Sequence, residues 1–96
     1  MAGESLTYHL IISEEAQKDI QRLKRSEPGA FKKVSILLTE LILHPYMGTG
    51  HPHPLKSDRS GQWSRSISKK HRLIYQVNDD IVIVEVLAAY GHYDDK

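Results

Sequence analysis

Residues 63–88 read WSRSISKKHRLIYQVNDDIVIVEVLA, and this stretch decides the fold. From 63 to 68 larger side chains alternate with serine, and from 72 to 77 a second alternation with a period of two follows. Such alternation predicts two strands. The polar run at 78–80 predicts a turn, and the almost uninterrupted apolar run at 81–88 predicts a third strand inside the sheet. We therefore expect an antiparallel meander.

The chain before this meander predicts one further strand and two helices. Residues 7–12 mix β-branched, aromatic and aliphatic side chains, and Ser13 then supplies a residue type that caps helix N-termini. Apolar residues recur after it at steps of four and three, which predicts an amphipathic helix. Pro28 begins a second, more apolar helical pattern that continues until His44 and Pro45.

The segment between the helices and the meander, 46–60, predicts a loop. Gly48, Gly50, Pro52 and Pro54 break any regular period there. The resulting order β-α-α-β-β-β predicts an α+β fold. In this fold two N-terminal helices pack on one face of an antiparallel-dominated sheet.

The bulk composition narrows the class of protein. The 96 residues suit a single domain, 1–96, with one hydrophobic core. No cysteine is present, so disulfide frameworks, thiolate metal sites and cysteine nucleophiles are excluded. The N-terminus lacks the cationic and apolar segments of a signal peptide, and no apolar run is long enough to span a bilayer. We expect a cytoplasmic protein.

Positive charge is concentrated between residues 51 and 75. This window holds six Lys or Arg residues and a single acid, Asp58, whereas the whole chain has a net charge of only +1. Such a cationic patch indicates a phosphate-rich partner, and the three histidines of the window add groups that transfer protons near neutral pH. A charge run is equally typical of a solvated face, so charge alone leaves both interpretations open.

A series of short motifs runs through the second half of the chain. The motifs are Pro54-Leu55-Lys56, Ser60-Gly61, Trp63-Ser64-Arg65, Ile67, His71-Arg72-Leu73-Ile74-Tyr75, Asp79-Asp80 and His92-Tyr93. Because these motifs occur in this order, the chain resembles the YoeB/Txe branch of the RelE-like toxins of bacterial toxin–antitoxin modules. The order of strands and helices expected from periodicity fits the RelE-like fold, so the two arguments agree.

The resemblance implies an mRNA endoribonuclease that cuts its message in the ribosomal A site. By analogy with the family, Arg72 neutralises the scissile phosphate, His92 transfers a proton, and Tyr93 orients the substrate or stacks on it. The family also implies a cognate YefM/Axe-like antitoxin that wraps the toxin and masks its active site. No membrane partner is implied, and a homodimer of the free chain stays open.

One position departs from the family pattern. Relatives carry a glutamate, the usual candidate for the general base, just before Pro-Leu-Lys, and here this position is His53. RNA cleavage without a metal lets the 2′-hydroxyl attack its own phosphate, which requires a base, an acid and a cation. We hypothesise that His53 is the base, His92 the acid and Arg72 the cation. No cofactor is expected. The alternative, a solvated His53 in a site where substrate positioning dominates, stays open.

The other basic residues of the window are candidates for holding RNA. Lysine and arginine attract phosphates without a preferred base sequence, so these residues suit backbone contacts better than chemistry. The candidates are Lys56, Arg59, Arg65, Lys69 and Lys70.

Several side chains near these candidates allow more than one role. His51 and His53 form only a weak metal pattern because no carboxylate lies nearby, so no metal site is predicted. Trp63 could stack on a nucleobase, but a packing role is favoured. Tyr75 is in phase with apolar neighbours and is expected in the core. His71 is expected in a solvated turn.

Two other functions stay open. A catalytically weak toxin homologue would act mainly as an antitoxin-binding partner in transcriptional autoregulation, and the substituted glutamate keeps this alternative in view. A ribosome-independent ribonuclease is the third possibility. The sequence reveals neither the codon preference nor the identity of the antitoxin.

Overall fold

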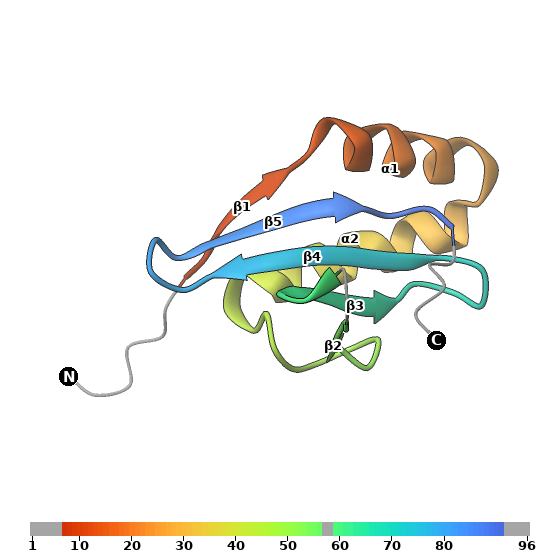
Figure 1. Ribbon diagram of the computed structural model, residues 1–96. Coiled ribbons are helices and arrows are strands. Elements are labelled where there is room, and N and C mark those ends of the chain that lie inside the picture. The colour runs from red at the N-terminus through yellow and green to blue at the C-terminus, as the bar shows by residue number, and fades with distance from the viewer. Residues whose placement is uncertain (1–6, 57–58, 92–96) are drawn as a thin grey trace.

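The computed structural model describes residues 7–56 and 59–91 (Figure 1). Its elements are β1 (His9–Ile12), α1 (Glu14–Ser26), α2 (Pro28–Leu43), β2 (His53–Pro54), β3 (Gln62–Ser66), β4 (Arg72–Asn78) and β5 (Ile83–Ala88). Two helices follow the first strand, and the remaining strands follow the helices. This confirms the expected α+β class.

The strands form one sheet in the order β1-β5-β4-β3-β2. Neighbouring strands from β2 to β5 are antiparallel, and β1 pairs with β5 in parallel. The meander β3-β4-β5 is therefore as expected. Because β1 occupies the edge next to β5, the last strand lies inside the sheet, which explains its almost continuous apolar sequence.

The first strand begins at His9 and not at residue 7, and β3 ends at Ser66 and not at residue 68. Two larger differences from the sequence prediction concern β2 and β5. The expected loop contains β2, which pairs with β3 at the edge of the sheet, a place where proline is tolerated. The last strand begins at Ile83 and not at residue 81. The reason is a longer turn, in which the Asn78 side chain accepts hydrogen bonds from the backbone N–H groups of Asp80 and Ile81. Val82 then has a φ of +53°, which is incompatible with a strand.

Local signals place the two helices where the sequence predicts them. The Ser13 hydroxyl accepts the N–H of Ala16 at 3.1 Å, an N-cap that typically stabilises a helix by about 1 kcal/mol. The same hydroxyl donates to the carbonyl of Leu87 at 3.1 Å and so ties the start of α1 to β5. Pro28 occupies the first turn of α2, where its missing N–H costs nothing. Neither helix in the described part of the chain is long and apolar enough to cross a membrane.

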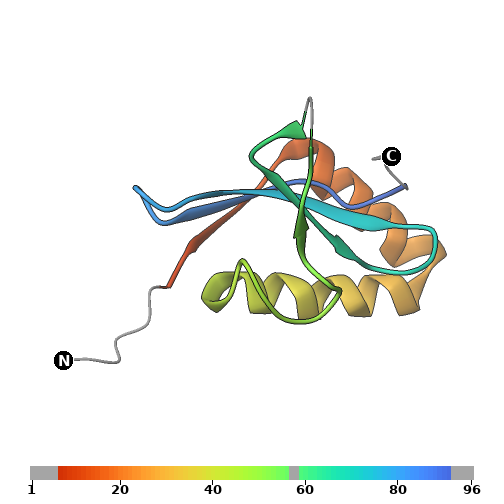
Figure 2. The same ribbon diagram turned by 60° about the horizontal axis from the view of Figure 1, so that its bottom comes forward.

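The core lies between the helices and one face of the sheet (Figure 2). Its largest fully buried apolar side chains on the helices are Leu23, Leu37 and Leu41, and those on β4 are Leu73 and Tyr75. The expected core position of Tyr75 is thus confirmed. Since side chains alternate across a strand, the neighbours of Leu73 and Tyr75 on β4 point to the opposite face.

Candidate active site

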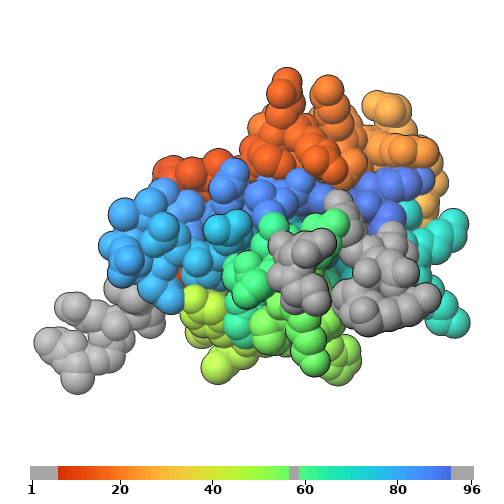
Figure 3. All heavy atoms as spheres, in the orientation of Figure 1, coloured from red at the N-terminus to blue at the C-terminus, as the bar shows by residue number. Residues whose placement is uncertain are grey.

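The sheet face opposite the helices carries the first two candidate catalytic residues. His53 on β2 pairs with Ser64 on β3, and Ser66 on β3 pairs with Arg72 on β4. Directly paired residues point to the same face of a sheet, and so do residues two apart on one strand. His53 and Arg72 therefore flank Ser64 on one face, which Figures 1 and 3 view from the side opposite α2.

Arg72 is half-buried at the start of β4. Its Nη1 donates to the Ser64 hydroxyl at 3.3 Å. Its Nε is buried and has no hydrogen-bond partner within residues 7–56 and 59–91. A buried donor without a partner costs about 1 to 3 kcal/mol, and more when the group is charged. An oxyanion that accepts from this guanidinium would remove that penalty.

His53 is held by the loop that precedes it. Its Nδ1 lies 3.2 Å from the carbonyl oxygen of His51. A carbonyl can only accept, so Nδ1 carries the proton and the lone pair of the neutral imidazole lies on Nε2. His53 is half-buried, and a general base at this position would use Nε2 as the atom that accepts the proton.

The end of the described chain is fixed beside Arg72. The backbone N–H of Arg72 donates to the carbonyl of Gly91 at 3.0 Å. His92 follows Gly91 directly in the sequence. His92 and Tyr93 themselves lie outside the described residues, so their catalytic roles stay predictions.

The expectation that Arg65 binds RNA is wrong. Arg65 is fully buried on the helix-facing side of β3, with an exposed fraction of 0%. Its Nη1 forms a salt bridge with Glu40 at 2.9 Å, and its Nε donates to the hydroxyl of Tyr75 at 3.2 Å. The guanidinium also donates to the carbonyls of His44, Met47 and Thr49. No phosphate can reach a side chain enclosed in this way.

Arg65 instead organises the loop that leads to His53. The Glu40 carboxylate accepts from the backbone N–H of Thr49 at 2.9 Å and from its hydroxyl. The hydroxyl of Thr49 and the charge of Arg65 hold the pKa of Glu40 below its usual range. Gly50 packs so closely on β3 that a Cβ there would lie 2.9 Å from the carbonyl oxygen of Ser66. No pattern in the sequence indicates this role for Glu40, which looks like an ordinary polar position on α2.

The remaining RNA-binding candidates lie in two separate places. Lys56 is exposed just after β2, and Arg59 is half-buried with its Nη1 3.4 Å from the side-chain oxygen of Gln62. Lys69 and Lys70 are exposed in the turn between β3 and β4, which projects at the right-hand end of the molecule in Figure 3. These four residues therefore offer two places for contact with a polyanion, one near β2 and one at the turn between β3 and β4.

The expectation of a solvated His71 is also wrong. Its exposed fraction is only 3%, and it bonds to Glu27 and to the backbone of Gly91. Lys69, Lys70 and His71 form a polar run that is typical of a solvated turn. In the structure the two lysines are exposed, whereas His71 is buried. Trp63 is half-buried against the core and lies 5.0 Å from Tyr46 between ring centroids, in line with the favoured packing role.

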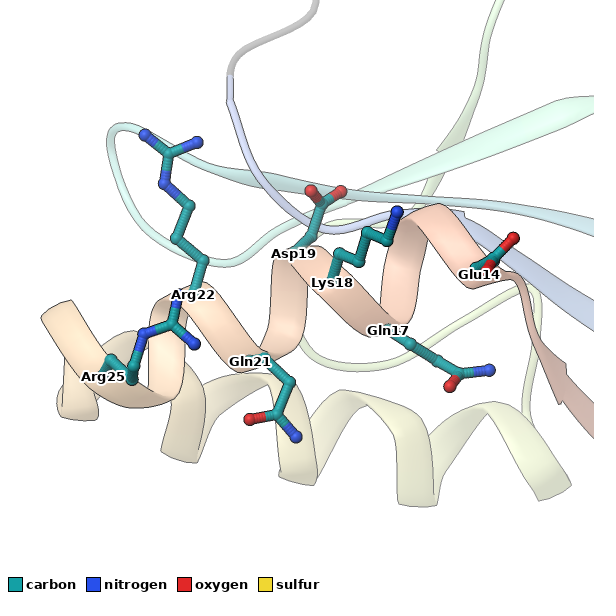
Figure 4. Close-up of a pocket in the computed structure, with 7 residues that line it drawn as sticks. All are labelled: Glu14, Gln17, Lys18, Asp19, Gln21, Arg22 and Arg25. Atoms are coloured by element: carbon teal, nitrogen blue, oxygen red, sulfur yellow. The ribbon is translucent and has the colours of Figure 1, made fainter.

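A hollow on the described surface lies apart from the face of His53 and Arg72. Within residues 7–56 and 59–91, no group of three or more His, Asp or Glu side chains could hold a metal ion. An open hollow runs along α1, but all the side chains that line it come from that one helix (Figure 4). It shares no residue with the face of His53 and Arg72.

Known proteins are similar to this chain in both sequence and fold. The family model of the YoeB-like toxin of bacterial type II toxin-antitoxin systems matches residues 12–93. Toxin YoeB of Escherichia coli K12 is 39% identical over 84 residues, which cover 88% of this chain and 98% of that protein. The structure of a YoeB/ParE toxin from Agrobacterium tumefaciens has a TM-score of 0.81 and 31% identity, covering 88% of this chain and 98% of that one.

A complex provides a third comparison. The toxin in the YoeB-YefM complex from Staphylococcus aureus has a TM-score of 0.75 and 29% identity, and the match covers 90% of this chain and 98% of that one. Both the sequence and the fold therefore match over nearly the whole length of these relatives. The chain belongs to the YoeB-like toxins of bacterial type II toxin–antitoxin systems.

Proposed function

We propose that this toxin is an endoribonuclease that cleaves mRNA in the cytoplasm while the message is being translated. The observation that carries this proposal is the placement of His53 and Arg72 on either side of Ser64, with Gly91 bonded to the backbone of Arg72. A proton acceptor and a cation thereby lie on one face, and the residue before a second histidine is bonded to the backbone of that cation. These are the groups that metal-free RNA cleavage requires.

In the proposed reaction the neutral His53 takes the proton of the 2′-hydroxyl. The 2′-oxygen attacks the adjacent phosphorus, the bond from phosphorus to the 5′-oxygen breaks, and His92 protonates that departing oxygen. The products are a 2′,3′-cyclic phosphate and a 5′-hydroxyl. Arg72 stabilises the charge that develops on the phosphoryl oxygens, and Tyr93 orients the substrate. The Nε of Arg72, which is buried without a partner in the described structure, supports its role in binding an oxyanion.

Four basic residues would hold the RNA backbone or ribosomal RNA in this reaction. They are Lys56, Arg59, Lys69 and Lys70. We further propose that a cognate antitoxin binds this toxin, because the related Staphylococcus aureus toxin forms a complex with YefM. The antitoxin would inhibit cleavage by covering the face of Arg72.

Translation of the target message provides the test of this function. We expect induction of the toxin to arrest growth, and primer extension to detect cuts in a reporter mRNA but not in the same mRNA without its start codon. Cuts in both messages, and in naked RNA, would indicate a ribosome-independent ribonuclease. A protein that binds its antitoxin and the promoter of its module but cuts no RNA under any condition would contradict the proposal.

The two histidines should have separable effects on the pH dependence of cleavage. Since one imidazole must be neutral and the other protonated, we expect a bell-shaped profile of kcat/KM against pH. His53→Ala should lower kcat by about 10²-fold and remove the dependence on the acidic side, where the base becomes protonated. His92→Ala should remove the dependence on the alkaline side. An unchanged rate and profile in His53→Ala would show that His53 is not the base.

A further inference from the structure

The three residues after β5 are each held by a side chain or backbone group from another element. The N–H of Ala89 donates to the carboxylate of Asp19 at 3.0 Å. The ring of Tyr90 lies between the guanidinium of Arg22, 4.1 Å from its centroid, and the ring of His71, 4.3 Å between centroids. Figure 4 shows Asp19 and Arg22 on the side of α1 that faces this part of the chain. These contacts hold the backbone in place from the end of β5 to Gly91.

We propose that His71, oriented by Glu27, is a positioning residue for RNA cleavage: it fixes the Gly91 N–H and so sets the position from which His92 enters the site. This inference rests on the proposed function. It assigns a role to two residues, one on the turn before β4 and one between the helices, that take no part in the chemistry described above.

The hydrogen bonds of His71 define one tautomer. Its Nδ1 lies 2.9 Å from the backbone nitrogen of Gly91, and its Nε2 lies 2.8 Å from a carboxylate oxygen of Glu27. A backbone N–H can only donate, so Nδ1 must accept and Nε2 must carry the proton. The Glu27 carboxylate accepts that proton in a hydrogen bond. His71 is therefore a neutral link between the junction of the helices and the end of the described chain.

Glu27 is suited to this role because its carboxylate forms no hydrogen bond to any described residue other than His71. It is the N-cap residue of α2, yet its side chain makes no capping hydrogen bond. The hydrogen bond from His71 and the nearby charge of Lys70 hold the pKa of Glu27 below its usual range. The carboxylate therefore stays ionised and acceptor-only, which keeps the proton of His71 on Nε2.

Gly91 is fixed from both sides by consecutive residues. Its N–H donates to the ring of His71, and its carbonyl accepts the backbone N–H of Arg72. Its φ of +90° lies in the left-handed region that favours glycine. Gly91, the last described residue, is thereby fixed to the start of β4, where the side chain of Arg72 also begins. A displacement of about 1 Å in a catalytic group can cost roughly 10²-fold in rate, so the two hydrogen bonds that fix Gly91 matter for proton transfer.

Two substitutions of His71 separate its two hydrogen bonds. In His71→Asn the amide oxygen can replace Nδ1 as the acceptor for Gly91, whereas in His71→Gln the amide replaces Nε2 and faces Glu27. We expect His71→Gln to lower kcat by about 10²-fold with KM unchanged, and His71→Asn to stay within about 10-fold of the parent. His9→Gln, the same exchange at an exposed histidine of β1, is the matched control and should leave kcat unchanged.

A purely structural role predicts a different pattern. Both His71 variants would then lose activity only in proportion to the unfolded fraction that a thermal melt measures, with no difference between Asn and Gln at a temperature where both are folded. That result would overturn the inference. If His92→Ala cleaves as well as the parent, the proposed function fails. If His92→Ala is inactive while His71→Gln is fully active, only the positioning role fails.

Nuclear magnetic resonance tests the link without any activity measurement. In protein labelled with ¹⁵N we expect His71 to be protonated on Nε2 alone, and a scalar coupling across the hydrogen bond between the Gly91 nitrogen and Nδ1. Glu27→Ala should weaken that coupling, because the ring then loses the acceptor that orients it. A proton on Nδ1 in the parent protein, or the absence of the coupling, would contradict the inference.

Discussion

Arg72→Ala should abolish most RNA cleavage while leaving the protein folded. An arginine that meets the charge of a phosphoryl transition state is worth about 10³ to 10⁵ in rate in comparable reactions, and we expect a loss of kcat/KM in this range. Folding should be little affected, since the Arg72 side chain makes one 3.3 Å hydrogen bond and leaves its Nε without a partner in the described structure. Single-turnover cleavage of a ribosome-bound message measures the effect.

Two further variants show what the guanidinium contributes. Arg72→Lys keeps the charge but loses the planar fork, so its activity should lie between those of the parent and Arg72→Ala. Lys32→Ala removes an exposed cation from α2, on the opposite side of the sheet, and should leave the rate unchanged. An Arg72→Ala protein that retains at least a tenth of the parent activity would show that Arg72 does not stabilise the transition state.

The sequence predicts the fold well because its local signals agree with the tertiary packing. Alternation along 72–77 places Leu73 and Tyr75 in the core, and the serine at position 13 caps the helix that the apolar stripe requires. One error occurs where a side chain changes the course of the backbone. Asn78 extends its turn by two hydrogen bonds, and this delays the start of β5 in a way that periodicity does not reveal.

The candidate site is harder to predict because charge does not indicate burial. Arg65 and Arg72 both lie on strands within one cationic window, and the sequence assigns both to RNA. They lie on opposite faces of the sheet, because Arg65 pairs with Leu73, and Arg72 is the neighbour of Leu73 on β4. Arg65 is buried because partners outside β3, among them Glu40 and the carbonyls of the loop after α2, enclose its guanidinium. The same reasoning explains His71, whose partner Glu27 is 44 residues away.

Arg65→Met should destabilise the protein more than any surface substitution. The variant leaves the Glu40 carboxylate and three loop carbonyls without the donors that Arg65 supplies. Removing one partner of a buried ion pair typically costs about 3 to 5 kcal/mol, and for a domain of this size each kcal/mol lowers the Tm by roughly 4 to 8 °C. We therefore expect a loss of more than about 10 °C in a thermal melt. Arg25→Met, at an exposed arginine of α1, should change the free energy of unfolding by no more than about 0.5 kcal/mol.

The double variant Arg65→Met with Glu40→Leu separates the loss of a partner from the loss of the pair. Because the leucine removes the carboxylate that Arg65→Met leaves unpaired, the two losses should be less than additive. The single variant should also lower kcat, since the loop that Arg65 holds leads directly to His53. If Arg65 bound RNA, the result would be the reverse: an unchanged Tm, a higher KM and a weaker dependence of binding on salt. Those measurements decide whether Arg65 supports the site from within or contacts the RNA.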